Sequence, residues 1–150
     1  MSIAKLAAIV WFAVTFVKLY DVTAPTDTAS TSTLVALLCA RERSSGYALA
    51  RGGLQGCEEP LVVYTSVHGH SSVEKAALLA GFGRDNLRAI PVDERQAMRP
   101  EALEAAILED LARGAVPCAV VATTGTTTTT AVDPIAAIAE IACRHGVWLH

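Results

Sequence analysis

Histidine and hydroxyl side chains gather at three places in the sequence where a helix is expected to begin. The stretch 68–72 (HGHSS) puts two of the four histidines beside a pair of serines. A hydroxyl-rich segment, 26–33 (TDTASTST), and a threonine run, 126–130, stand at two similar positions. Backbone N–H groups at a helix start carry partial positive charge, and neighbouring hydroxyls add hydrogen-bond donors. The three segments therefore favour binding of a phosphate or another anion.

Each of these segments also has an ordinary structural explanation. Hydroxyl residues in 28–31 serve equally well as helix N-caps, and the threonine run suits an exposed, flexible loop. Ser71 and Glu74 have the spacing of a capping box, in which each side chain bonds the backbone N–H of the other residue. This predicted box does not account for His70, which stands where an apolar residue is usual. His68 is predicted to be a solvated turn residue.

Several other kinds of site lack their sequence signatures. The chain contains neither the GxGxxG pattern of dinucleotide-binding folds nor the GxxxxGK[ST] pattern of P-loops. Its cysteines show no CxxC pair and no spacing with histidine that indicates a metal or a disulfide framework. We therefore predict no metal, and reduced thiols in a cytoplasmic protein, each of them buried as small core filler. The four residues concerned are Cys39, Cys57, Cys118 and Cys143.

Length and composition indicate one folded core. The 150 residues are 52% hydrophobic and 18% charged, which argues against a disordered chain. The net charge of -3 gives no electrostatic reason to expect nucleic acid or an anionic membrane as a partner. The uncharged run 6–17 is shorter than the roughly 20 residues that a spanning helix needs. We expect it to form a buried helix or strand rather than a signal peptide, or to be foreign to the domain, so 1–23 stays unassigned.

Strand and helix patterns alternate along the rest of the chain. Short apolar, β-branched runs predict strands at 61–66, 87–92, 117–125 and from 147 onward. Helical periodicity predicts a helix at each of four positions, with Asp133 as the N-cap of the last one and Pro134 as its first residue. This alternation predicts an α/β fold with a mostly parallel sheet and flanking helices. Because the sequence stops just as a strand begins, we expect the fold to be incomplete.

A family resemblance covers the chain from about Thr26 to His150. The segments TASTSTLVALLCARER, HSSVEKAALLAGFG and AIPVDERQAMRPEALEAAILEDLARGAVPCAVVATTGTTTTTAVDPIAAIAEIACRHGVWLH carry it, in unbroken order. They resemble the group II decarboxylases that depend on pyridoxal 5'-phosphate (PLP), and the aromatic-L-amino-acid decarboxylase branch in particular. The most specific motifs are the Ala-Ser helix entry, the His-Ser-Ser-Val-Glu-Lys turn and the Ala-Thr-x-Gly-Thr-Thr loop.

The resemblance implies a fold and a set of site residues. Residues 24–150 would form part of a fold-type I, PLP-binding large domain. Ala29 and Ser30 match the residues that hold the cofactor phosphate, and Thr127 matches a residue that lines the cofactor pocket. His70 matches the histidine that stacks on the pyridine ring, and we expect it to be catalytic by holding that ring and handling protons.

Two further catalytic groups of the family would lie beyond His150. One is the aspartate that pairs with the ring nitrogen, and the other is the lysine that bonds covalently to the cofactor. Lys75 lies in the helix that follows the HGHSS turn and is expected to point away from the ring. We therefore expect residues 1–150 by themselves to be inactive.

The reaction that the resemblance implies is decarboxylation of an L-amino acid, and the resemblance favours an aromatic one. The resemblance also implies a cytoplasmic homodimer that binds a small-molecule substrate, namely an amino acid, and binds neither nucleic acid nor membrane. Two other functions stay open. One is a different fold-type I enzyme, such as an aldehyde synthase or a carbon–sulfur lyase, and the other is a non-catalytic truncated paralogue.

Overall fold

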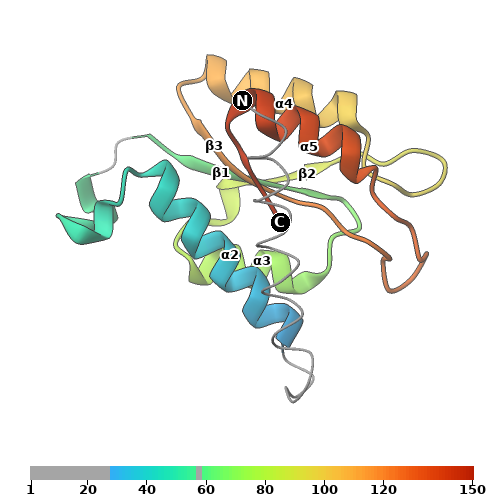
Figure 1. Cartoon of the computed structure of the whole chain (residues 1–150), viewed down its shortest axis with the longest axis horizontal. Coiled ribbons are helices and arrows are strands. Elements are labelled where there is room, and N and C mark those ends of the chain that lie inside the picture. The colour runs from blue at the N-terminus through green and yellow to red at the C-terminus, as the bar shows by residue number, and fades with distance from the viewer. Residues whose placement is uncertain (1–27, 57–58) are drawn as a thin grey trace, which may run out of the picture.

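A computed structural model describes the backbone of residues 28–56 and 59–150 (Figure 1). The predictions for residues 1–23 lie outside this described part, as does Cys57. The principal elements in chain order are α2 (Thr28–Ser44), β1 (Leu61–Ser66), α3 (Ser71–Leu79), β2 (Leu87–Ile90), α4 (Pro100–Ala112), β3 (Val116–Val121), α5 (Ile135–His145) and β4 (Trp148–Leu149). Short 3-10 helices cover Ala48–Ala50, Gly53–Gly56 and Arg84–Asn86.

The strands agree with the prediction at their starts better than at their ends. β1 has the predicted bounds, because its run of apolar and β-branched residues is buried from Val62 onward. β2 stops at Ile90, one residue before Pro91, which has no N–H to offer a neighbouring strand. β3 stops at Val121, four residues earlier than predicted, and the chain continues as a loop.

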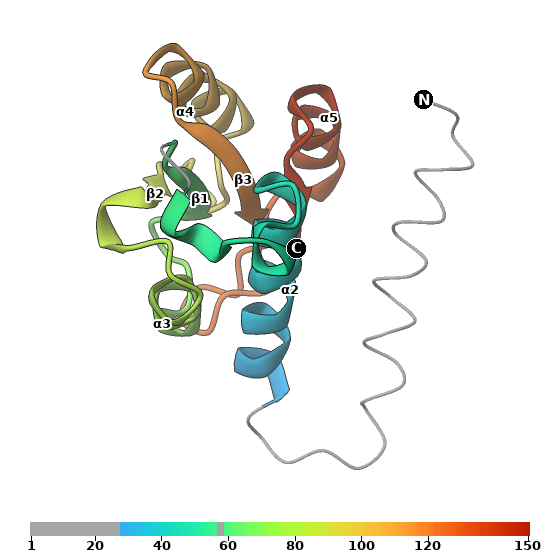
Figure 2. The same ribbon diagram turned by 90° about the vertical axis from the view of Figure 1, so that its left-hand side faces the viewer.

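All four strands are parallel, in the order β2-β1-β3-β4. Helices α2 and α3 cover one face of the sheet, and α4 and α5 cover the other (Figure 2). The chain passes from β1 to β2 through α3, and from β2 to β3 through α4. The predicted α/β fold with a mostly parallel sheet and flanking helices is thus confirmed.

Two apolar clusters fill the space between the sheet and its two helical layers. Because side chains alternate along a strand, β1 contributes Val62 and Tyr64 to the α4/α5 side and Val63 to the α2/α3 side. Leu103 and Ile107 of α4 are fully buried, as their helical spacing predicts, whereas Leu111 in the same series is 47% exposed.

Polar side chains join the last turn of α4, which precedes the amino end of β3, to the neighbouring strands. Asp110 of α4 is fully buried, accepts the Tyr64 O–H at 2.7 Å and receives Arg88 at 2.9 Å. Arg113 also pairs with Asp110. Burial, followed by the hydrogen bond to Asp110, raises the pKa of Tyr64, so that its hydroxyl stays protonated. These contacts join the end of α4 to β1 and β2.

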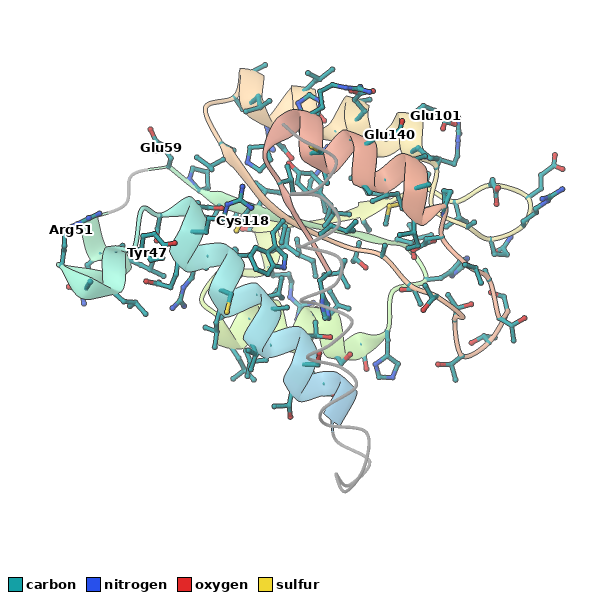
Figure 3. All side chains as sticks on the ribbon, viewed as in Figure 1. Tyr47, Arg51, Glu59, Glu101, Cys118 and Glu140 are labelled. Atoms are coloured by element: carbon teal, nitrogen blue, oxygen red, sulfur yellow. The ribbon has the colours of Figure 1, made fainter. Side chains whose placement is uncertain are left out.

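The cysteines differ from the prediction that all are buried. Cys118 is buried on β3 beneath α2 (Figure 3), and burial raises the pKa of its thiol to about 11. Cys39 and Cys143 are exposed, because each lies on the outward side of its helix. In the described ranges, 28–56 and 59–150, no helix is long and apolar enough to cross a membrane.

Candidate functional site at the carboxyl ends of β1 and β3

The connections that follow the neighbouring strands β1 and β3 run to opposite faces of the sheet. From β1 the chain enters α3 on one face, whereas from β3 it enters α5 on the opposite face. The turn 67–70 and the loop 122–134 therefore diverge from adjacent strand ends (Figure 1). Ligands of open parallel sheets bind where strand connections separate in this way. The histidine turn and the threonine loop, singled out in the sequence, flank this point.

His70 is the N-cap of α3. Its backbone is extended, with φ -61° and ψ 143°, and its Nδ1 accepts the Ser72 N–H at 3.2 Å. The same nitrogen lies 2.9 Å from Ser72 Oγ. Since Nδ1 serves as the acceptor, we assign the proton of the neutral ring to Nε2. The imidazole is exposed at the carboxyl edge of the sheet, where it can meet a ligand.

The predicted capping box is wrong. The imidazole of His70 satisfies a free N–H of the first turn, so the cap lies one residue before Ser71. Glu74 forms an ion pair with Arg84 at 2.5 Å instead of reaching back to the cap. Capping chemistry therefore explains His70, which the sequence had left unexplained, and any contact of its ring with a ligand is an additional role.

The second histidine of the turn connects it to the loop before α4. His68 Nε2 lies 2.6 Å from Gln96 Oε1, and Gln96 has a left-handed backbone with φ 64°. His68 is exposed, as predicted.

The threonine run folds back on itself as a hydrogen-bonded turn. Thr126 is buried, and its Oγ1 lies 2.6 Å from Thr129 Oγ1 and accepts the Ala131 N–H at 3.1 Å. The Thr130 N–H donates to the Thr126 carbonyl at 2.9 Å. Thr127 is exposed within this turn. These bonds give the loop more internal structure than a simple flexible connection has.

Asp133 holds the base of this loop and is not the predicted N-cap. Its Oδ1 accepts the Met98 N–H at 2.7 Å, and its Oδ2 accepts the Thr123 N–H at 2.8 Å. Both carboxylate oxygens are thus engaged elsewhere, and Pro134 takes the cap position of α5. Asp133 is only 2% exposed. Sequence reasoning missed this role, because the donors lie 35 and 10 residues away along the chain.

Helix α2 brings its amino end to the same edge of the sheet (Figure 1). Ala29 and Ser30 lie in its first turn, which has no acidic residue to repel an anion, and Ser30 is exposed. Thr33 follows one turn later, and its Oγ1 lies 3.3 Å from Nε2 of His150. Burial lowers the pKa of His150, so this histidine favours its neutral form. The contact connects α2 to the end of β4, and sequence reasoning had not singled it out.

The groups at this edge suit a phosphate and a flat ring. The start of α2 offers N–H groups and the Ser30 hydroxyl, and His70 offers an exposed imidazole. Thr65 and Ser66, at the end of β1, are buried with hydroxyls that have no hydrogen-bond partner in the described part of the chain. Lys75 is exposed on α3. Among the described residues, no group of His, Cys, Asp or Glu side chains has a metal-binding arrangement.

The chain matches one protein family over its whole length. The sequence model described as "Pyridoxal-dependent decarboxylase conserved domain" matches residues 1–150. Phenylacetaldehyde synthase of Arabidopsis thaliana is 40% identical over 124 residues, which are 81% of this chain and 24% of that protein. Cysteine sulfinic acid decarboxylase of Homo sapiens is 48% identical over 91 residues, 61% of this chain and 18% of that protein.

A solved structure supports the same relationship. The crystal structure of Oryza sativa TDC with PLP and tryptamine has a TM-score of 0.74 and 37% sequence identity. The likeness covers 81% of this chain and 25% of that chain. The chain thus spans about a quarter, or less, of the length of the proteins it matches.

Proposed function

We propose, because the chain belongs to the pyridoxal-dependent decarboxylase family, that it supplies one wall of the cofactor site of a longer PLP-dependent L-amino-acid decarboxylase. The family membership and the fold-type I architecture agree with the predictions made from sequence. The observation that carries the proposal is the meeting of the α2 start, the His70 turn and the threonine loop at one edge of the sheet.

Each of these segments has a role in the proposed site. The first turn of α2, with Ala29 and Ser30, would bind the phosphate through backbone N–H groups and the serine hydroxyl. His70 would lie against the ring face with Nδ1 held by Ser72 and Nε2 directed away from that contact. Thr127 would line the pocket from its exposed position in the loop. Asp133 would hold this loop in place through its two backbone donors.

The residues of this chain would hold the cofactor, and the cofactor would supply the chemistry of the reaction. When bound, PLP would supply an electron sink for decarboxylation of the substrate. His70 would keep the ring plane fixed and would carry a proton at Nε2. The ring-nitrogen aspartate and the cofactor-binding lysine would follow His150 in the longer protein, and residues 1–150 by themselves would be inactive.

An aromatic L-amino acid is the substrate that we favour. The support is the likeness to Oryza sativa TDC, solved with tryptamine, and to phenylacetaldehyde synthase. The second of these relatives favours an aldehyde synthase as the alternative function. We further propose a homodimer in the cytoplasm, on the resemblance alone.

The test uses the complete polypeptide that contains residues 1–150. We expect the sequence after His150 to place an aspartate two positions on and a His-Lys pair later, and the purified protein to show the absorbance band of lysine-bound PLP. The protein is then incubated separately with L-tryptophan, L-tyrosine, L-phenylalanine and cysteine sulfinate. We expect release of CO2 and an amine from an aromatic substrate. Release of an aldehyde with ammonia would favour the alternative, and lack of PLP binding would refute the proposal.

A further inference from the structure

The residue before His70 is a glycine that touches the strand beneath it. A Cβ at Gly69 would lie 2.5 Å from Thr65 Oγ1, 3.2 Å from Thr65 Cγ2 and 3.1 Å from the Ser66 carbonyl oxygen. Gly69 does not have a positive φ, so its backbone conformation is open to other residues. Close approach to Thr65, and not backbone conformation, is what requires glycine at this position.

Thr65 cannot easily move aside. It is 6% exposed and lies on β1 between Ala89 of β2 and Val121 of β3, with which it pairs in register. Its side chain is branched at Cβ, which restricts rotation about χ1. Its Oγ1 has no hydrogen-bond partner among the described residues. The contact of Thr65 with Gly69 is therefore steric and involves no hydrogen bond of the Thr65 hydroxyl.

The turn above Thr65 is held on both sides of the glycine. The Gly69 N–H donates to the Ser66 carbonyl at 2.8 Å, and the Val67 N–H donates to the Ile90 carbonyl at 3.0 Å. On the other side, His70 is fixed by its cap contact with Ser72. A side chain at position 69 would therefore displace the backbone that carries the imidazole.

We infer that Gly69 and Thr65 are positioning residues, a matched pair whose combined size sets where the His70 imidazole stands above the sheet. Ordinary van der Waals contact begins at 3.4 Å, so a Cβ at 2.5 Å needs a shift of about 1 Å. Displacements of this size reduce the efficiency of an active site by about 10²-fold. The inference rests on the proposed function for the role of His70, but the contact itself does not.

The test is a set of variants in the complete polypeptide, followed by PLP titration through fluorescence quenching and by crystal structures. Gly69→Ala should shift His70 by roughly 0.5–1 Å and weaken PLP binding about tenfold or more. Adding Thr65→Ala removes both side-chain atoms that meet the new Cβ and should return the affinity to within about threefold of Thr65→Ala alone. Thr65→Val, which keeps the branched shape and lacks the hydroxyl, should not rescue Gly69→Ala.

The outcomes separate this inference from the proposed function. An unmoved His70 in Gly69→Ala, or equal rescue by Thr65→Val and Thr65→Ala, would overturn the inference. If Gly69→Ala does not fold, recovery of folded protein by Thr65→Ala alone supports it, and recovery by neither partner overturns it. If His70 moves as expected but PLP binds equally well, the matched pair stands as structure and its role in binding is refuted. The proposed role of His70 itself is tested by substitutions at position 70.

Discussion

Two buried carboxylates, Asp110 and Asp133, lie toward opposite ends of the parallel strands, Asp110 before β3 begins and Asp133 after it ends. They are held by different kinds of partner. Asp110 is held by side chains, namely Tyr64, Arg88 and Arg113. Asp133 is held by two backbone N–H groups, each from a different loop. The first arrangement joins a helix to two strands, and the second fixes the path of loops. The contacts of Asp110 thus stabilise the packing of α4 on the sheet. The contacts of Asp133 stabilise the loops of the candidate site at the carboxyl ends of the strands.

The largest effect should follow from loss of the Asp133 carboxylate. Asp133→Ala leaves the buried N–H groups of Met98 and Thr123 without acceptors, at a cost of about 1–3 kcal/mol each. Hydrogen–deuterium exchange of these two amides should accelerate more than tenfold, and PLP binding should weaken. Asp93 is the matched control, because its Oδ1 also accepts two backbone N–H groups but is exposed to water. If Asp93→Ala has the same effect, burial of Asp133 is not what matters.

A smaller effect, confined to stability, is expected at the other end of the strands. Tyr64→Phe removes the O–H that donates to Asp110 and should lower the free energy of unfolding by about 1–2 kcal/mol. PLP affinity should remain unchanged, because Tyr64 is fully buried in the core against α4 and α5 and belongs to none of the segments that form the candidate site. Urea unfolding and PLP titration of the complete polypeptide measure the two quantities. A marked loss of PLP affinity would remove the distinction between the two ends.

The same variant should alter the dependence of stability on pH. The pKa of Tyr64 is raised in the folded state, so its contribution is present below the unfolded value of about 10 and is lost as pH rises above it. Between pH 9 and 11 the native protein should therefore lose more stability than Tyr64→Phe. Parallel unfolding curves over this range would show that the Tyr64 hydroxyl is not held in its protonated form.

The smallest effect is expected for the surface pair beside the candidate site. Glu74 and Arg84 are in contact at 2.5 Å, but their side chains are 39% and 73% exposed. Such pairs contribute less than about 1 kcal/mol, and Glu74→Ala should change the free energy of unfolding by no more than about 0.5 kcal/mol. A loss above about 1 kcal/mol would indicate that Glu74 also supports the start of α3, as a capping box would.

Local patterns in the sequence were enough to predict most elements of the fold. The apolar run 61–66 gives β1 its exact bounds, and Gly146 ends α5 in a left-handed conformation, as a helix-terminating glycine does. Alternation of strands and helices also predicted the parallel sheet. The order of the strands followed from the structure, because pairing depends on contacts between segments far apart in sequence.

The candidate site was predictable in part. Ser30, His70 and Thr127 were singled out by local motifs and by family resemblance, and their segments lie at one edge of the sheet. Asp133 was assigned to a helix cap because its nearest neighbours suit one, yet its true donors come from distant loops. Gly69 gave no signal, since only the folded strand reveals that Thr65 lies against it.

In the proposed site the His70 ring meets the cofactor in addition to capping α3, and two substitutions separate these roles. His70→Asn keeps a side chain that caps the Ser72 N–H but removes the ring, whereas His70→Phe keeps a ring and loses the cap. The decisive measurement is the dissociation constant of PLP for both variants of the complete polypeptide. We expect about a tenfold weaker affinity for His70→Asn and a change below about threefold for His70→Phe. Unchanged affinity in His70→Asn, with loss in His70→Phe, would contradict this expectation and leave His70 as a helix cap only.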